Sequence, residues 1–387
     1  MQVSALLMAA GRGARFGADT PKQYLPLLGR PVLRHAAEAL LQDGLVERLL
    51  PVCAPEERGR VAALLDGLPG VLPPVPGGGT RQRSVRAGLE ALAASPGEPP
   101  PAAVLVHDAA RPVVPAGTVA RLLAALADAS GAIPAQRVTD TLKRGEAGRI
   151  VATVPRQGLW RAQTPQAFRF PELLAAHRAA AGDATDDAEI LEAAGGSVAL
   201  VQGSESNVKI TFPEDLGRVA ASLSAGLLPR IGTGFDVHRI AVGRPMVLCG
   251  VHLPCEFGLD GHSDADVGIH ALCDAIYGAL AEGDIGRHFP PSEMRWKDAD
   301  SARFLRHAAD RIAARGGFLA NADVTLLCER PKIGPHRDAM QARLADLLGV
   351  EPSRVGVKAT TTERLGFTGR GEGIAAQAAA MVLLPAC

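Results

Sequence analysis

Asp236 and His238 stand one residue apart in the segment Ile231-Gly-Thr-Gly-Phe-Asp-Val-His238. In an extended chain this spacing puts both side chains on one face of a strand, where they could bind one metal ion. His270, in the first turn of a predicted helix, is the candidate third ligand. One aspartate and two histidines leave a fourth tetrahedral position open, which is the arrangement expected for catalytic Zn²⁺. The alternative is a strand end whose polar side chains bind nothing.

Two glycine-rich turns in the first half of the chain could bind phosphates. The first, Ala9-Ala-Gly-Arg-Gly-Ala-Arg15, follows a short apolar run, and Lys22 lies shortly after it. It has neither the spacing of the dinucleotide fingerprint nor the Gly-Lys-Ser/Thr of a P-loop, but glycines beside two cations suit a polyphosphate. The second, Gly77-Gly-Gly-Thr-Arg81-Gln-Arg-Ser84, leads into a helix and could cradle a base or phosphates. For each turn, the alternative is a structural turn without a ligand.

A predicted buried strand ends at Asp108, whose carboxylate could hold Mg²⁺ on the phosphates of a nucleotide. Arg111, three residues beyond it, could reach a second anion. Further on, the segment Thr185-Asp-Asp-Ala188 precedes an Ile-Leu run and predicts the start of a helix, with Thr185 as the capping residue. We interpret this last segment as structural.

The elements that must position these residues change character near residue 230. Before it, strands and helices alternate, which implies βαβ units and a mainly parallel sheet with ligands at the carboxyl ends of its strands. After the short join 226–230 a fresh hydrophobic pattern begins. A length of 387 residues suggests two to three domains. We therefore expect a first domain over 1–225 and a second over 231–387.

Composition limits the classes of partner. Acidic and basic side chains balance at 41 each, which gives no general attraction to nucleic acid or to anionic membranes. The first residues lack a basic region and no apolar run reaches about 18 residues, so we expect neither export nor membrane insertion. The six cysteines form no Cys-x-x-Cys pair, which favours a reducing cytoplasm. Cys249, Cys255 and Cys273 are rival metal ligands, but they lack metal-type spacing.

The first half carries several separated motifs that together resemble the 2-C-methyl-D-erythritol 4-phosphate cytidylyltransferase family. They are Ala9-Ala-Gly-x-Gly-x-Arg15, Pro21-Lys22-Gln-Tyr, Gly78-Gly-x-Arg81-x-x-Ser84, His107-Asp-Ala-Ala-Arg111-Pro, Leu159-Trp-x-Ala-x-Thr164-Pro-Gln and Asn207-x-Lys209. The resemblance implies a Rossmann-like nucleotidyltransferase domain that uses CTP and methylerythritol 4-phosphate. It makes Arg15, Lys22 and Lys209 catalytic; Ala9, Ala10, Gly11, Gly78, Arg81, Ser84 and Asp108 nucleotide-binding, with Mg²⁺ or Mn²⁺ at Asp108; and Arg111, Thr141, Arg156 and Thr164 substrate-binding, some of them across a dimer interface.

The second half resembles the 2-C-methyl-D-erythritol 2,4-cyclodiphosphate synthase family, a smaller α+β domain. The motifs are Gly234-Phe-Asp236-x-His238, Gly261-His-Ser-Asp-Ala-Asp266-Val-x-x-His270, Gly283-Asp-Ile-Gly and the run from Lys358 to Gly373. Cys328-Glu-Arg330 departs from the family pattern. The resemblance implies Zn²⁺ on Asp236, His238 and His270; Glu363 as a catalytic residue with a second divalent ion; Thr360 and Thr361 on the nucleotide; and His262, Ser263, Asp284, Gly286, Phe367 and Arg370 on the substrate.

Together the two resemblances predict a bifunctional enzyme for two non-consecutive steps of the methylerythritol phosphate route, with a separate kinase between them. Association with that kinase is a further hypothesis. The resemblances also imply a homo-oligomer, in which dimeric transferase contacts and trimeric synthase contacts could combine in a hexamer. Two alternatives remain open. One is a nucleotidyltransferase of other specificity with an appended phosphohydrolase, and the other is a nucleotide-sensing or scaffolding module without catalysis.

Overall fold

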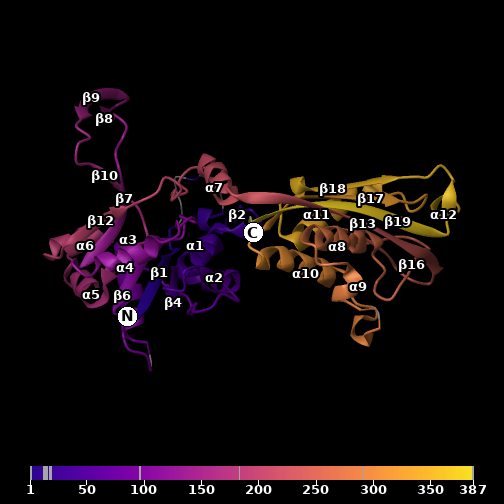
Figure 1. Cartoon of the computed structure of the whole chain (residues 1–387), viewed down its shortest axis with the longest axis horizontal. Helices are drawn as coiled ribbons and strands as arrows, with labels where there is room; N and C mark the ends of the chain where they lie inside the picture. Colours follow the sequence, from indigo (N-terminus) through magenta and orange to yellow (C-terminus); the bar gives the residue numbers. More distant parts are fainter. Residues whose placement is uncertain are drawn as a thin grey trace. The chain divides into compact units, whose positions relative to one another are not determined.

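The chain separates into two compact units, Met1–Leu223 and Ser224–Cys387. A computed structural model describes residues 2–11, 16, 20–95, 97–182, 184–290 and 292–385. Figure 1 shows the elements of each unit, which we take in turn. None of the described helices is long and apolar enough to cross a membrane.

The first unit is built on one twisted sheet. Its strands follow the order β10-β7-β11-β6-β1-β4-β5, and β12 pairs with β7. The pairs among β1, β4, β5 and β6 and the pair of β7 with β12 are parallel, whereas β10 and β11 pair antiparallel with their neighbours. This confirms the predicted α/β class with a mainly parallel sheet. The bounds are β1 Val3–Met8, β4 Arg48–Cys53, β5 Val75–Pro76, β6 Ala103–Asp108, β7 Gly131–Arg137, β10 Trp160–Ala162, β11 Gln166–Arg169 and β12 Val198–Gln202.

Helices cover both faces of this sheet, which is why the central strands are continuously apolar. On β1, Leu7 packs in the same core as α1 (Val32–Leu41), α2 (Arg58–Leu64) and α4 (Thr118–Ala125), whereas Leu6 packs in the core of the opposite face. That second core contains α3 (Arg81–Ala93), α5 (Phe170–Ala179) and α6 (Asp187–Ala193). The unit ends in α7 (Glu214–Ser224), and short elements complete it: η1 Lys22–Tyr24, β2 Pro26–Leu27, β3 Arg30–Pro31 and η2 Pro55–Glu57.

The start of α6 differs from our prediction. Its N-cap is Asp186, whose carboxylate accepts a hydrogen bond from the Glu189 backbone N–H at 3.0 Å. Thr185 lies one residue earlier and donates through both its N–H and its hydroxyl to the Glu189 carboxylate, each at 2.7 Å. The prediction of Thr185 as cap was therefore wrong, because a carboxylate one residue later competes for the same amide.

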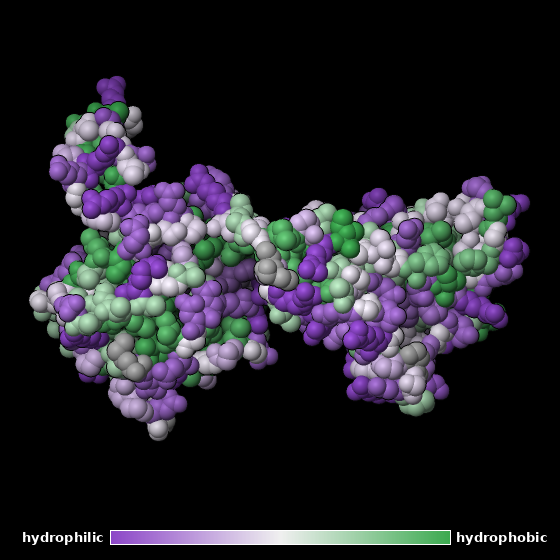
Figure 2. All heavy atoms as spheres, in the orientation of Figure 1, coloured by the Kyte–Doolittle hydropathy of each residue, from purple (hydrophilic) through white to green (hydrophobic). Residues whose placement is uncertain are grey.

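A hairpin of β8 (Leu142–Glu146) and β9 (Arg149–Val154) stands out from the first unit between β7 and β10. Figure 2 shows that the surface of this arm mixes hydrophilic and hydrophobic residues. Ile150 and Val151 are 69% and 50% exposed.

The second unit contains a sheet of order β16-β13-β19-β17-β18, in which β17 and β18 pair in parallel and the other pairs are antiparallel. With helices packed on it, the sheet confirms the predicted α+β class. β13 begins at Leu227, within the predicted join 226–230, and pairs with β19 from there on. The bounds are β13 Leu227–Val242, β14 Met246–Leu248, β15 Val251–Leu253, β16 Phe257–Asp260, α8 Val267–Leu280, α9 Ile285–His288, η3 Met294–Trp296, α10 Ala302–Ala314, β17 Phe318–Leu327, η4 Gly334–His336, α11 Arg337–Leu348, η5 Pro352–Arg354, β18 Val355–Thr360, α12 Gly366–Gly369 and β19 Gly373–Pro385.

Helix α8 lies directly on strand β13 because two glycines remove the side chains between them. A Cβ on Gly232 would lie 2.0 Å from the Ala275 carbonyl oxygen, and a Cβ on Gly234 would lie 2.0 Å from that of Ala271. No side chain fits into that space, so the backbone of the helix touches the backbone of the strand. This contact brings His270 of α8 next to Asp236 of β13.

Candidate active sites

Asp236, His238 and His270 form a nearly equilateral triangle of ligand atoms. Asp236 Oδ2 lies 3.1 Å from His238 Nε2 and 3.1 Å from His270 Nδ1, and the two nitrogens are 3.1 Å apart. Tetrahedral ligands about 2.0–2.1 Å from a zinc ion would be about 3.3 Å apart. Among the described residues, this is the group of His, Cys, Asp and Glu side chains that could hold a metal ion, and it contains neither Glu363 nor a cysteine. The structure thus brings together the three predicted ligands.

The remaining polar atoms of the triad already have partners that suit metal binding. Asp236 Oδ1 accepts the Val237 backbone N–H at 2.8 Å, which leaves Oδ2 for a metal. His238 Nδ1 lies 2.8 Å from the Asp260 carbonyl oxygen. A ring proton on Nδ1 donates to that carbonyl, so the Nε2 lone pair faces the triad.

His270 is oriented from the opposite side by two serines. Its Nε2 lies 2.9 Å from Ser301 Oγ and 3.1 Å from Ser263 Oγ, so a proton on Nε2 leaves the Nδ1 lone pair for a metal. The Ser301 hydroxyl donates to the Asp264 carboxylate, which also accepts the Ser301 backbone N–H at 3.0 Å. Ser301 lies 31 residues from His270 and was not among the residues predicted from the sequence.

The charges of the triad reinforce one another. Burial works against ionisation of Asp236, but its close contacts with His238 and His270 hold the pKa of its carboxyl below the usual range. Burial also disfavours the charged form of His238 and so lowers the pKa of its imidazole, but the contact with Asp236 outweighs burial and raises that pKa. Asp236 is therefore ionised at neutral pH, as a metal ligand must be.

We predict that Ser301→Ala weakens metal binding about tenfold, within the range found when a partner of a metal-bound histidine is removed. Ser263 still lies near His270 Nε2, so the loss should deepen in the Ser263→Ala, Ser301→Ala double variant. Equilibrium dialysis against Zn²⁺ measures this. Ser353→Ala, at an exposed position of the same unit, is the control. Equal affinity in the double variant and the wild type would contradict the assigned role.

The other predicted residues of the second unit lie around or beyond the triad. Ser263 contacts it, and the buried His262 Nε2 has no hydrogen-bond partner among the described residues. Asp284 caps α9, which contains Gly286, by accepting the Arg287 N–H at 2.9 Å.

A separate loop after β18 contains the other predicted groups. The Thr361 hydroxyl donates to Glu363 Oε1 at 2.7 Å, and Thr360 ends the strand. Glu363 and Arg364 have left-handed φ values of 52° and 67°. Glu329, part of the segment that departs from the family pattern, accepts the N–H groups of Thr362 and Arg364 at 3.1 and 3.2 Å and so holds this strained loop in place. Farther along, Phe367 is 37% exposed and Arg370 pairs with Glu372 at 2.8 Å.

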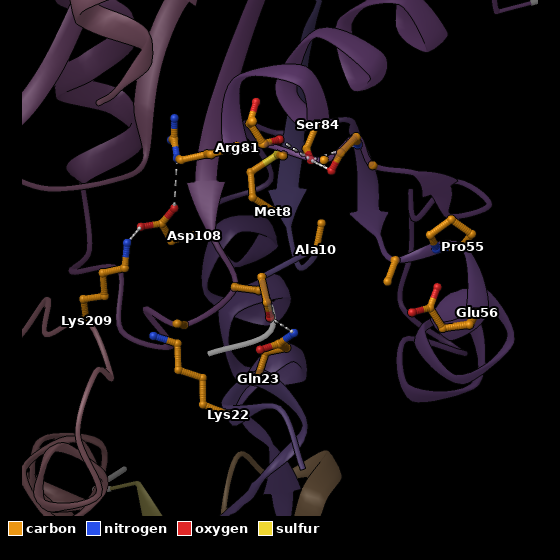
Figure 3. Close-up of a pocket in the computed structure, with 18 of the residues that line it drawn as sticks. Met8, Ala10, Lys22, Gln23, Pro55, Glu56, Arg81, Ser84, Asp108 and Lys209 are labelled. Atoms are coloured by element: carbon orange, nitrogen blue, oxygen red, sulfur yellow. Dashed lines mark hydrogen bonds and ion pairs between the residues drawn. The ribbon is translucent and has the colours of Figure 1, made fainter. Parts of the chain in front are cut away.

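A cavity of about 710 Å³ opens at the carboxyl ends of β1, β4 and β6 in the first unit. Figure 3 shows Lys209, Asp108 and Arg81 on one side of it, with Lys22 and Ser84 at other parts of its wall. Among the predicted residues it is lined by Ala10, Gly11, Lys22, Gly78, Arg81, Ser84, Asp108 and Lys209. Arg15, the remaining predicted catalytic cation, lies outside the described residues.

The two glycine-rich turns pack against each other at the cavity. A Cβ on Gly77 would lie 2.9 Å from the Ala10 Cβ and 2.8 Å from Ser84 Oγ, which excludes larger residues. Ser84 Oγ accepts the Gly78 N–H at 3.0 Å and lies 2.8 Å from the Thr80 carbonyl oxygen. Gln23, which the sequence analysis did not single out, donates to the carbonyls of Ala9 and Gly11, each at 2.9 Å. These contacts fix both turns at the cavity wall.

Asp108 is surrounded by cations. Lys209 Nζ lies 2.7 Å from Oδ2, Arg81 Nε 3.8 Å from Oδ1, and Arg111 Nε 3.9 Å from Oδ2. Burial works against ionisation of this carboxyl, but Lys209 and Arg81 hold its pKa well below the usual range. Lys22 reaches the same segment from the other side, since its Nζ donates to the Ile210 carbonyl at 2.6 Å. A carboxylate among cations beside two amide-rich turns suits a divalent ion and phosphates.

Thr164 lies behind Asp108 and not on the cavity wall. Its Oγ1 accepts the Asp108 N–H at 3.1 Å and lies 3.0 Å from His107 Nδ1, while His107 Nε2 lies 2.9 Å from the Arg111 carbonyl oxygen. Burial lowers the pKa of His107 to about 4, so its neutral ring donates to that carbonyl and accepts from Thr164. Thr164 thereby orients Asp108.

The remaining predicted residues of the first unit are spread out. Arg111 donates through Nη1 to the Asn207 carbonyl at 2.7 Å. Thr141 and Arg156 lie at the base of the β8–β9 arm, where Arg156 donates to the Thr139 carbonyl. The structure does not bring these two residues to the cavity wall.

Comparison with known proteins matches both halves of the chain to known families. Residues 3–225 match the family described as 2-C-methyl-D-erythritol 4-phosphate cytidylyltransferase, and residues 229–383 match the YgbB family. The chain is 62% identical to the bifunctional enzyme IspD/IspF of Granulibacter bethesdensis, with 100% of both chains covered. It is 59% identical to that of Gluconobacter oxydans over 100% of this chain and 99% of the relative. Among solved structures, the bifunctional IspDF from Campylobacter jejuni is 31% identical, with 99% of each chain covered and a TM-score of 0.48.

Proposed function

The chain belongs to the family of bifunctional IspD/IspF enzymes, and we propose that each of its two units carries one of the two activities at the site described above. It is a cytidylyltransferase and a cyclodiphosphate synthase of the methylerythritol phosphate pathway. The first activity transfers CMP from CTP to 2-C-methyl-D-erythritol 4-phosphate and releases pyrophosphate. The second cyclises 4-(cytidine 5'-diphospho)-2-C-methyl-D-erythritol 2-phosphate to the 2,4-cyclodiphosphate and releases CMP. This family relation removes the two alternatives raised by the sequence.

We assign the first activity to residues 1–225 and the second to residues 231–387. The observation that carries the assignment is the pairing of a cavity lined by cations and amides in one unit with a three-ligand site in the other. Transfer between phosphates needs placed positive charge more than covalent chemistry by the protein. A three-ligand site with an open position suits polarisation of a phosphate oxygen.

In the first reaction, an oxygen of the 4-phosphate attacks the α-phosphorus of CTP and the bond to pyrophosphate breaks. Lys22 and Lys209 from the described cavity, with Arg15, would stabilise the charge that develops on the α-phosphoryl oxygens. The turn 9–11, Gly78, Arg81 and Ser84 would bind the nucleotide, and Arg111, Thr141, Arg156 and Thr164 the sugar phosphate. Mg²⁺ or Mn²⁺ at Asp108 would neutralise charge on the nucleotide phosphates.

In the second reaction, the 2-phosphate attacks the β-phosphorus of the same molecule and CMP leaves. Ser263 and Asp284, with His262, Gly286, Phe367 and Arg370, would orient the substrate, and Thr360 and Thr361 its diphosphate. Family enzymes use divalent metals, and we propose Zn²⁺ for Asp236, His238 and His270, where it would act as a Lewis acid and template. Glu363 would hold a second divalent ion.

We propose a homo-oligomer that shares both kinds of site between subunits. In the second unit Glu363 lies outside the metal-ligand group, and one face of β13 exposes Ile231, Phe235 and Val237 at 69%, 60% and 40%. A strand face of this kind suits the trimeric contact expected of the synthase family. In the first unit, Thr141 and Arg156 at the arm suit completion of a neighbour's cavity in a dimer.

The product of the first reaction lacks the 2-phosphate that the second requires, so a kinase must act between them, and we propose it as an associating partner. The five cysteines among the described residues are free. This supports action in a reducing cytoplasm.

Asp108→Asn tests the assignment of the first activity. The change removes the carboxylate that faces Lys209, Arg81 and Arg111, so we expect pyrophosphate release to fall at least about 100-fold, a typical loss for one preorganised electrostatic group. CMP release by the same preparation should be unchanged. Pyrophosphate is measured with CTP and methylerythritol 4-phosphate, and Asp128→Asn, at an exposed position of the same unit, is the control. Absence of pyrophosphate release by the wild type would refute the proposed activity itself.

A further inference from the structure

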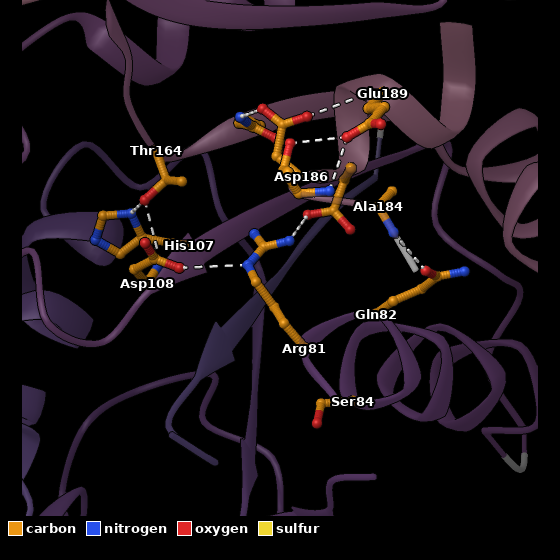
Figure 4. Close-up of polar contacts among 12 residues, drawn as sticks. Arg81, Gln82, Ser84, His107, Asp108, Thr164, Ala184, Asp186 and Glu189 are labelled. Carbon is orange, nitrogen blue, oxygen red and sulfur yellow. Dashed lines mark hydrogen bonds and ion pairs between the residues drawn. The ribbon is translucent and has the colours of Figure 1, made fainter. Parts of the chain in front are cut away.

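A chain of alternating charges runs from the nucleotide cavity into the interior of the first unit. Lys209 contacts Asp108 at 2.7 Å, Asp108 faces Arg81 at 3.8 Å, and Arg81 Nη1 lies 2.8 Å from Asp187 Oδ2. Behind Asp187, His177 Nε2 lies 3.1 Å from Oδ1. Figure 4 shows Arg81 reaching past Asp108 toward the start of α6. The sequence analysis treated that helix start as structural.

Asp187 and His177 are costly groups to bury. Both side chains are fully buried, and the carboxylate needs a charged partner there because an isolated buried charge is strongly destabilising. Asp187 is not needed as a helix cap, since Asp186 performs that role. With a proton on His177 Nε2, the ring donates to Asp187 Oδ1. Among the described residues, His177 Nδ1 and Asp187 Oδ2 have no hydrogen-bond partner, so the contact that neutralises Oδ2 is its ion pair with Arg81 Nη1 at 2.8 Å. Arg81 is thus the cation that balances Asp187.

The distances indicate which carboxylate anchors Arg81. Its contact with Asp187 is 1.0 Å shorter than its contact with Asp108 (3.8 minus 2.8 Å). Burial opposes the charge of Arg81, but Asp187 contributes more than Asp108 to the rise in its guanidinium pKa. Arg81 therefore lines the cavity, whereas its positive charge is neutralised mainly by the buried Asp187 carboxylate. Asp108 Oδ1 keeps room for another partner.

Resting on the proposed function of the first unit, we propose that Asp187 is a positioning residue for nucleotidyl transfer, which holds Arg81 back from Asp108 and is itself oriented by His177. Arg81 has a planar fork that can pair with a carboxylate through two N–H groups. Without the charge of Asp187, that fork turns to Asp108 and pairs with it directly. The carboxylate is then blocked for the divalent ion that accompanies CTP. Asp187 acts through Arg81 and touches no substrate.

Asp187→Asn separates this role from a structural one. We expect the Mn²⁺ concentration for half-saturation of the CTP-loaded protein, measured by electron paramagnetic resonance, to rise about tenfold, as when a supporting partner of a metal ligand is lost. The KM for Mg–CTP should rise by a similar factor, with a smaller change in kcat at saturating metal. Glu189→Gln, which removes a negative charge from the same helix without contacting Arg81, is the control.

A double-variant cycle decides whether the effect passes through Arg81. In an Arg81→Gln background, Asp187→Asn should add nothing to the Mn²⁺ half-saturation value, whereas additive effects would overturn the proposal. If Asp187→Asn does not fold, Arg81→Lys is the replacement test, because one ammonium group cannot contact both Asp187 and Asp108 in this geometry. The Mn²⁺ requirement should then change in Arg81→Lys. An unchanged Mn²⁺ requirement in Arg81→Lys would also overturn the proposal. If the wild type released no pyrophosphate, the proposed function would fail, while the Mn²⁺ titrations would still test the link between Asp187 and Arg81.

Discussion

Asp236→Ala is expected to abolish CMP release and metal binding by the second unit while pyrophosphate release by the first unit continues at the wild-type rate. The variant removes the oxygen that lies 3.1 Å from both histidine nitrogens and leaves two ligands. Loss of a Lewis acid forfeits several kcal/mol of transition-state stabilisation. At about 1.4 kcal/mol per factor of ten, CMP release should fall at least about 10³-fold.

Metal content and both products are measured on one preparation of the full chain. Asp346→Ala is the control, because this carboxylate lies on α11 of the same unit and pairs only at the surface with Arg343. A normal zinc content in Asp236→Ala would refute the ligand assignment. Loss of both activities together would instead indicate that the change had damaged the whole chain.

Two of the three ligands, Asp236 and His238, could be predicted because their placement depends on local geometry, whereas the approach of His270 depends on the packing of α8 on β13. A period of two places Asp236 and His238 on one face of any strand, and both residues lie in β13. The site of the first unit could also be predicted from the sequence pattern. Alternating strands and helices bring the loops at the carboxyl ends of β1, β4 and β6 to one edge of the sheet. The residues of those loops line the cavity.

The orienting partners could not be predicted, because their contacts join distant parts of the chain. Ser301 is one of many serines until the fold places it 2.9 Å from His270. In the sequence, Asp187 belongs to a segment that predicts only the start of a helix. It pairs with Arg81 because α3 and α6 pack on the same face of the sheet. Glu329 likewise marks only a departure from the family pattern until its contacts with the loop at 362–364 are seen.

The role of the glycines under α8 could not be predicted either, although Gly232 and Gly234 lie in the same segment as the ligands Asp236 and His238. Their contacts are with a helix that comes much later in the chain. Gly232 and Gly234 alternate with Thr233 and Phe235 along β13, so both glycines face the helix. On the helix, Ala271, Ala275 and Ala279 recur every four residues, and their backbone atoms are among those nearest to the two glycines. The close approach that results sets the distance from His270 to Asp236.

Gly234→Ala should therefore destabilise the second unit strongly, although a glycine-to-alanine change usually stabilises a compatible site by about 0.4–1 kcal/mol. The new Cβ would lie 2.0 Å from the Ala271 carbonyl oxygen, which belongs to helix backbone and cannot rotate away. Ordinary contact begins at 3.4 Å, so α8 must move by about 1.4 Å (3.4 minus 2.0 Å). Because the clash is with helix backbone, we expect a loss of about 3 kcal/mol, at the upper end of the usual cost of overpacking.

The same displacement moves His270 relative to β13, so metal binding should weaken together with stability. Urea unfolding of the full chain and zinc content measure the two effects, and pyrophosphate release should persist because the first unit is unchanged. The matched control is Gly334→Ala, where the new Cβ meets nothing within 4 Å and the backbone is not left-handed. If Gly234→Ala and Gly334→Ala had equal stability and equal zinc content, α8 would not lie on β13 as closely as the triad requires, and the geometry of the metal site would need another explanation.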